Sequence, residues 1–157
     1  DPPAGVGGSA CGIVAAGRVE REDGPHAVVL ADASISHAEP MRWATIAVEL
    51  ARSLKADAIV AEANNGGEMV RAVLHAAAPD VFVRLVRASD SKRLRAEPMA
   101  AYYAQGRITH AAAFAELEDE MCAFGADGQR TGADRVDALV WALSDLFKCA
   151  RPRVSAL

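Results

Sequence analysis

Short apolar runs alternate with stretches of helical periodicity along this chain, and this alternation limits its possible folds more than any other feature. The expected strands lie at 12–19, 26–31, 58–61, 81–86 and 107–110. The expected helices lie at 40–54, 69–77, 93–105, 114–124 and 134–147. The first two strands are separated by a segment that ends in Asp23-Gly24, a strong turn signal, and so predict a β-hairpin. The order predicts an α/β fold with a mixed sheet, antiparallel at its start and parallel later, flanked by helices.

The size and composition of the chain favour a single globular domain. With 157 residues, 52% hydrophobic and 24% charged, it has enough apolar residues for one buried core, so we expect one domain over residues 1–157. No apolar run approaches the roughly 18–20 residues needed to cross a bilayer. Residues 1–17 also lack the basic start of a signal peptide. We therefore expect no membrane association and a site of action in the cytoplasm of whatever cell holds the protein.

The cysteines exclude two common ways of stabilising a small fold. Cys11, Cys122 and Cys149 are odd in number, lie far apart and form no CxxC pair. Neither a zinc ribbon nor a disulfide framework is therefore encoded. We expect three reduced and mostly buried thiols.

The net charge hides a strongly basic segment. A net charge of −4 argues mildly against nucleic-acid binding, because affinity for DNA comes largely from Lys and Arg at phosphates. One short stretch is nevertheless rich in these residues: Arg84, Arg87, Lys92, Arg93 and Arg95. This segment could hold DNA phosphates, and the alternative is an ordinary solvated basic face.

Three acidic residues stand out by their positions. Glu62 follows a buried strand at the edge where sites form in open α/β sheets, although a solvated carboxylate would also fit there. Asp134 and Asp137 lie three residues apart on one face of the last helix. Asp134 could simply cap that helix, whereas Asp137 has low helix propensity within it. Carboxylates from separate elements, with no Cys or His partners, are typical of a site for a hard cation.

The remaining conspicuous residues favour structural interpretations. We expect Trp43 and Trp141 to be core or core-edge residues rather than platforms for base stacking. The histidines are scattered and predict no shared site. The segment 64–67 predicts a tight turn, although its backbone amides could also face a phosphate.

Several motifs follow one another along the chain: Asp1–Pro3, Cys11–Val14, Leu30–Ser34, Glu62–Val70, Lys92–Pro98 and Asp134–Leu143. Taken in this order, they resemble the nuclease domain of tailed-phage terminase large subunits, and related prophage and gene-transfer-agent terminases share them. The resemblance covers nearly the whole chain. It implies a ribonuclease H-like fold with a central five-stranded mixed sheet, whose first strand would precede Asp1 and lie beside the strand ending at Glu62.

The resemblance also implies the roles of individual residues. Asp1, Glu62 and Asp137 match the metal ligands of the family, and Asp134 lies where some relatives carry an additional ligand. Lys92 matches a family lysine, for which we expect a contact to the reacting phosphate. The four acidic residues, Asp1, Glu62, Asp134 and Asp137, would hold Mg²⁺ or Mn²⁺, with two ions about 4 Å apart that activate water and stabilise the leaving oxygen.

The implied function is endonucleolytic cleavage of double-stranded DNA, with little sequence preference, during packaging of a viral genome. The chain contains no GxxxxGK[ST] motif, so we expect the ATPase domain of a terminase to be absent from it. The resemblance implies that domain, the small terminase subunit and the portal protein as partners. The alternatives are a ribonuclease H-like resolvase or hybrid nuclease, and a non-catalytic module that docks on DNA or the portal.

Overall fold

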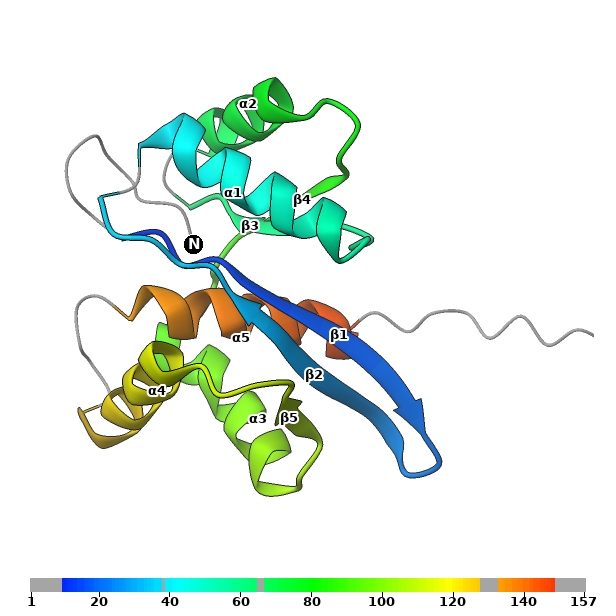
Figure 1. Ribbon diagram of the computed structural model, residues 1–157. Coiled ribbons are helices and arrows are strands. Elements are labelled where there is room, and N and C mark those ends of the chain that lie inside the picture. The colour runs from blue at the N-terminus through cyan, green and yellow to red at the C-terminus, as the bar shows by residue number, and fades with distance from the viewer. Residues whose placement is uncertain (1–9, 38, 65–66, 128–132, 149–157) are drawn as a thin grey trace, which may run out of the picture.

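A computed structural model describes residues 10–37, 39–64, 67–127 and 133–148, which form an α/β structure (Figure 1). The strands are β1 (Val14–Arg21), β2 (Gly24–Asp32), β3 (Ile59–Glu62), β4 (Val83–Val86) and β5 (Ile108–His110). The helices are α1 (Pro40–Ser53), α2 (Gly67–Ala77), α3 (Lys92–Ala104), α4 (Ala115–Asp127) and α5 (Asp134–Lys148). Every strand and helix expected from the sequence is confirmed, with ends that differ by a few residues.

Local signals in the sequence explain how several of these elements begin. Gly24 closes the β1–β2 hairpin with a φ of +114°, a conformation that other residues rarely adopt. Pro40 occupies the first turn of α1, where its missing N–H costs no hydrogen bond. Ser91 caps α3, because its hydroxyl oxygen accepts a hydrogen bond from the backbone N–H of Leu94 at 3.3 Å.

The strands differ from expectation in one respect, because they do not form a single five-stranded sheet within the described residues. They form a three-stranded sheet in the order β1-β2-β5 and a two-stranded sheet of β3 and β4. The β1–β2 pair is antiparallel, whereas β2–β5 and β3–β4 are parallel, so the mixed directions are as expected. The strand that the resemblance places beside β3 would precede Asp1, which itself lies outside the described residues.

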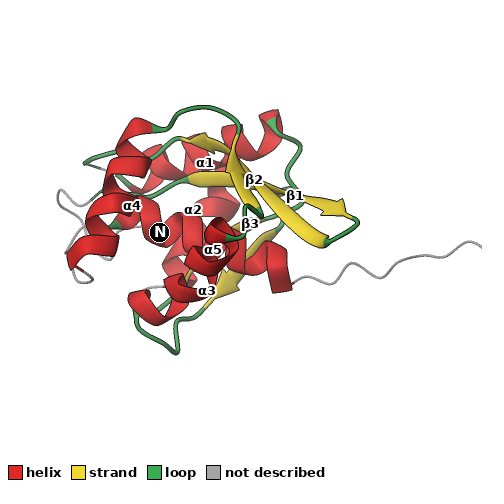
Figure 2. Ribbon diagram, turned by 90° about the horizontal axis from the view of Figure 1, so that it is seen from below, coloured by secondary structure: helices red, strands yellow, loops and turns green. Residues whose placement is uncertain are grey.

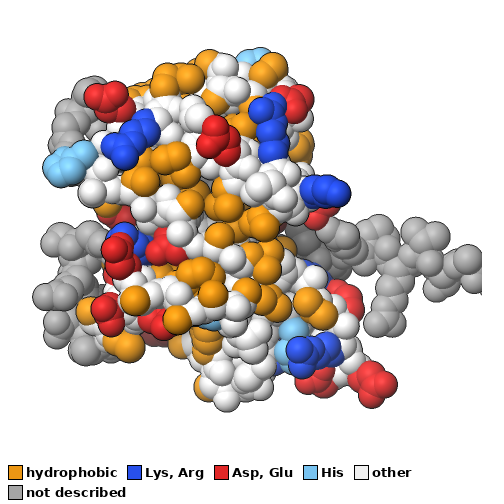
Figure 3. Space-filling view, in the orientation of Figure 1, with side chains coloured by type: hydrophobic (Ala, Val, Ile, Leu, Met, Phe, Trp, Pro, Cys, Tyr) orange, Lys and Arg blue, Asp and Glu red, His pale blue; other side chains and the backbone are white. Residues whose placement is uncertain are grey.

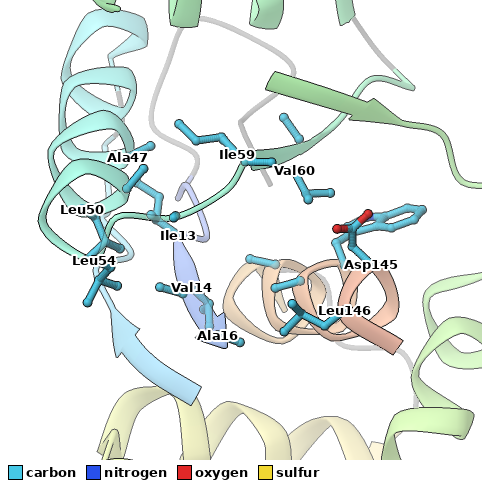
Figure 4. Close-up of a pocket in the computed structure, with 18 of the residues that line it drawn as sticks. Ile13, Val14, Ala16, Ala47, Leu50, Leu54, Ile59, Val60, Asp145 and Leu146 are labelled. Atoms are coloured by element: carbon cyan, nitrogen blue, oxygen red, sulfur yellow. The ribbon is translucent and has the colours of Figure 1, made fainter. Parts of the chain in front are cut away.

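A cavity of about 740 Å³ lies between β1 and β3 and separates the two sheets. In Figure 4, residues of β1 and β3 border this cavity, together with Ala47, Leu50 and Leu54 from the α1 side and Leu146 from α5. The lining is mainly apolar. Among the described residues, β1 and β3 have no backbone pairing with each other, so the strands form two sheets.

Helix α5 is the central element of the packing (Figures 1 and 2). It contacts β1 and β3 as well as α3 and α4, and its buried residues include Asp137 and Trp141. One hydrophobic cluster joins α5 to β2, β5, α3 and α4, and a second lies among α1, α2 and β3. Gly12 permits the close approach of the chain to α5, because a Cβ atom there would collide with the backbone carbonyl of Asp134.

The cysteines agree only partly with expectation. Cys11 and Cys122 are both free thiols, but Cys11 is buried while Cys122 is exposed. Burial raises the pKa of the Cys11 thiol to about 11, which makes it unreactive near neutral pH. Cys149 lies outside the described residues. None of the described helices has the length and apolar character needed to span a membrane.

Candidate active site

The structure brings Glu62 and Asp137 together around one cation. Glu62 is the last residue of β3, and Asp137 lies in the first turn of α5. The Arg95 Nη2 atom, from α3, lies 2.6 Å from Asp137 Oδ1 and 3.8 Å from Glu62 Oε2. Since one nitrogen reaches both carboxylates, the two oxygens are no farther apart than these two distances combined. Residues from three separate elements thus converge on a single point.

Two side-chain donors fix the Glu62 carboxylate, one at each oxygen. The indole Nε1–H of Trp141 donates to Oε2 at 2.7 Å, and the Asn64 amide donates to Oε1 at 2.7 Å. Asn64 is itself held, because its Oδ1 accepts the backbone N–H of Ala88 at 2.9 Å. The carboxylate therefore has a defined orientation, with lone pairs left over for a cation.

Asp137 is the more deeply buried of the two carboxylates, with only 3% of its surface exposed. Its place in the first turn of α5 favours a negative charge, because the N-terminal end of a helix carries partial positive charge. The Oδ2 atom lies 3.2 Å from Lys92 Nζ, but the angles do not form a hydrogen bond. We therefore regard this contact as an ion pair that leaves a buried oxygen free to accept a further ligand. Such an oxygen, beside Glu62, fits a metal ion.

Arg95 lies inside the site rather than on the surface. Its side chain is only 10% exposed, and its Nη1 donates to the backbone carbonyl of Asp90 at 2.8 Å. The guanidinium carbon lies 4.7 Å from the centre of the Trp141 ring, in cation–π geometry. Its Nε is buried and has no hydrogen-bond acceptor among the described residues. Arg95 would have to leave these contacts before it could hold a DNA phosphate.

The other predicted metal ligands are placed differently. Asp1 lies outside the described residues. Asp134 is the half-buried first residue of α5, three positions before Asp137. In the part of the chain that the structure describes, no three His, Cys, Asp or Glu side chains are grouped closely enough to hold a metal ion. The described residues thus supply a converged pair of carboxylates, Glu62 and Asp137.

The predicted basic segment is divided between the site and the surface. Lys92 lies at the rim of the site with 45% of its side chain exposed. Arg87 and Arg93 are exposed to solvent, and Arg93 Nε lies 3.8 Å from Glu97 on the same helix. Arg84 instead forms an ion pair with Asp145 of α5. On the face seen in Figure 3, basic and acidic side chains are interspersed, so that face has no continuous basic patch.

A second ionic network, which no pattern in the sequence indicates, holds the first turn of α5. Arg135 pairs with Asp32 at the end of β2 (3.1 Å) and with Glu116 and Glu120 of α4. Glu120 also accepts the backbone N–H of Val136 at 3.0 Å, and its pKa is raised because it is partly buried. These contacts join β2, α4 and α5, so they fix the helix turn that carries Asp137.

One known protein family matches a span of the chain that contains this whole site. The family described as the terminase RNaseH-like domain matches residues 1–146, a span that includes every predicted site residue. No curated protein matches the chain significantly in sequence. The matched span includes both members of the carboxylate pair, Glu62 and Asp137.

Proposed function

Because the chain belongs to the terminase ribonuclease H-like domain family, we propose that it is a metal-dependent endonuclease that cuts double-stranded DNA during viral genome packaging. The observation that carries this proposal is the convergence of Glu62 and Asp137 on one cation, Arg95. Two carboxylates held this close repel one another unless positive charge lies between them. A divalent ion bound to oxygen ligands would meet the same electrostatic requirement.

Glu62 and Asp137 would hold Mg²⁺ or Mn²⁺, since both ions prefer carboxylate oxygens. Asp1 and Asp134 are proposed to complete a site for two ions. When bound, such ions supply an activated water molecule and stabilise the leaving oxygen of a phosphodiester. The chain's own contribution is to orient the carboxylates, as Trp141 and Asn64 do for Glu62.

The basic residues near the pair would position the DNA. Lys92 lies at the rim, where a phosphate brought to the carboxylates would meet its ammonium group. Arg87 and Arg93 are exposed and can contact phosphates farther along the backbone. Contacts of this kind carry no sequence information, so we propose cleavage with little sequence preference. The ATPase domain of a terminase, the small terminase subunit and the portal protein are proposed as partners.

Two alternative functions can be distinguished from this one by experiment. A resolvase or hybrid nuclease would use the same carboxylates on branched DNA or on RNA–DNA hybrid. A non-catalytic docking module would bind DNA or the portal without cutting. The paired carboxylates disfavour docking, because burial of two acids beside each other destabilises the folded state, and docking on DNA or the portal does not require such a pair.

Plasmid cleavage tests these alternatives directly. The protein is incubated with supercoiled, linear and branched DNA and with RNA–DNA hybrid, in Mg²⁺, Mn²⁺ or EDTA. We expect nicking and then linearisation of the plasmid that EDTA stops. Glu62→Gln and Asp137→Asn, which keep side-chain volume but remove charge, should each abolish cutting. Glu97→Gln on the exposed face of α3 is the control. Cutting that survives both site changes would contradict the proposal, and preference for another substrate would favour the resolvase or hybrid nuclease.

A further inference from the structure

We propose that Trp141 is a positioning residue whose indole N–H holds the Glu62 carboxylate in the orientation needed for metal binding. This inference rests on the proposed function. The indole Nε1 lies 2.7 Å from Glu62 Oε2, a contact that joins α5 to the end of β3. Trp141 is only 8% exposed, so its N–H has little access to water and depends on this acceptor.

The geometry of α5 explains why a tryptophan can serve here. Asp137 and Trp141 are four residues apart, so they lie on the same face of the helix, one turn from each other. One turn therefore supplies a carboxylate, and the next supplies the donor that orients the facing carboxylate of Glu62. A shift of α5 would move both together, which preserves their mutual geometry.

The donor set of Glu62 leaves its remaining lone pairs available. Trp141 holds Oε2, while Asn64 holds Oε1. An ionised carboxylate has about four lone-pair sites, so two hydrogen bonds fix its plane without filling it. An indole N–H can only donate, so it cannot turn to compete as a ligand for the cation. Donors of this kind behind a metal ligand commonly strengthen metal binding by fixing the orientation of the ligand.

The ring of Trp141 has a second contact that depends on the same placement. Its face lies under the Arg95 guanidinium at 4.7 Å, while its N–H edge reaches Glu62. A purely hydrophobic residue of the core would need neither contact. Phenylalanine would fill much of the same space and keep an aromatic face toward Arg95, but it would lack the N–H.

The experiment therefore compares Trp141→Phe with Trp43→Phe. Trp43 is the only other tryptophan, is buried at 4% exposure, and belongs to the cluster of α1, α2 and β3. Both changes remove the same atoms from a buried site, so a loss of packing should lower the melting temperature in both. Only Trp141→Phe should weaken Mg²⁺ or Mn²⁺ binding, by about 10- to 100-fold in isothermal titration calorimetry.

Fluorescence supplies a second measurement on proteins that retain the site. Trp43→Phe leaves Trp141 as the sole tryptophan, and its emission should change during a Mg²⁺ titration because its ring contacts Glu62. Trp141→Phe leaves only Trp43, whose emission should stay constant. This measurement needs no cleavage activity and does not require Trp141→Phe to bind metal.

The outcomes separate the two proposals. If the unaltered protein binds metal and cuts DNA, but Trp141→Phe binds metal as tightly, the positioning role of Trp141 is wrong and the nuclease proposal stands. An unchanged Trp141 emission on metal binding would lead to the same conclusion. If the unaltered protein binds no divalent ion, the proposed function fails and the role of Trp141 fails with it.

Discussion

Replacing Arg95 with methionine should destabilise the protein strongly in the absence of metal. The substitution keeps an unbranched apolar side chain but removes the charge that lies 2.6 Å from Asp137. Side-chain exposures of 10% and 3% place this pair in the interior, where loss of one partner costs about 3–5 kcal/mol. Lys92 stays within 3.2 Å of the other Asp137 oxygen, so we take the lower end of that range. A loss of about 3 kcal/mol corresponds to a fall in melting temperature of roughly 6–12 °C for a domain of this size.

Thermal melts in EDTA and in saturating Mg²⁺ or Mn²⁺ measure this effect. A ligand at 100 times its Kd stabilises the folded state by about 2.7 kcal/mol. In the unaltered protein the ion must replace Arg95 between the carboxylates, whereas in Arg95→Met it restores a missing charge. Metal should therefore narrow the gap in melting temperature between the two proteins.

Arg52→Met is the matched control for that comparison. Arg52 forms an equally short pair with Asp80, at 2.6 Å, but the two side chains are 54% and 66% exposed. Exposed pairs contribute about 0–1 kcal/mol, so this change should hardly affect the melting temperature, with or without metal. Equal melting of Arg95→Met and the unaltered protein in EDTA would refute the reasoning. A difference in melting temperature between these two proteins that stays the same when metal is added would also refute it.

Three further predictions concern other parts of the molecule. Gly12→Ala should lower the free energy of unfolding by about 3 kcal/mol in urea titrations, because the new Cβ meets the backbone of the first turn of α5. Arg87→Ala and Arg93→Ala should each flatten the slope of log DNA affinity against log salt by about 0.9, measured by fluorescence anisotropy; an unchanged slope would make them ordinary solvated residues. The pKa of Glu118 is lowered because it accepts a hydrogen bond from His110 and another from a backbone amide. Its stabilising effect should be complete above the ordinary pKa of a glutamate and disappear as the pH falls through the lowered value. The melting temperatures of the unaltered protein and Glu118→Gln should therefore converge in acid.

The elements of the fold could be predicted because their signals are local. Pro40 marks the start of α1, and the turn at Gly24 closes the hairpin, where neighbouring residues alone decide the conformation. Apolar periodicity identifies a helix without any knowledge of its partners. Strand pairing depends instead on segments far apart in the chain. The division of the strands into two sheets could therefore not be derived from periodicity.

The candidate site could be predicted only in part, for a similar reason. Glu62 stood out because it follows a buried strand at the sheet edge where sites form, and Asp137 because aspartate has low helix propensity. Trp141 was expected in the core and is buried, but its donor role depends on an acceptor 79 positions away. Arg95 was predicted to hold phosphate, whereas the structure places it against Asp137. The residue type alone does not distinguish an arginine that faces solvent from one that turns inward.

The charges at the start of α3 nevertheless indicate that this basic segment has an acidic partner elsewhere in the fold. The first turn of a helix favours acidic residues, because its backbone N–H groups carry partial positive charge. Helix α3 begins with Lys92 and Arg93, followed by Arg95, and has no acidic residue in its first turn. This arrangement opposes the helix dipole, so the charges need compensation from elsewhere. Asp137 provides it, with one oxygen near Lys92 and the other bonded to Arg95, from the first turn of α5. Local rules of this kind are most often broken at functional sites, where the cost is offset by contacts that the site requires. The basic start of α3 therefore makes physical sense only together with the buried aspartate at the start of α5.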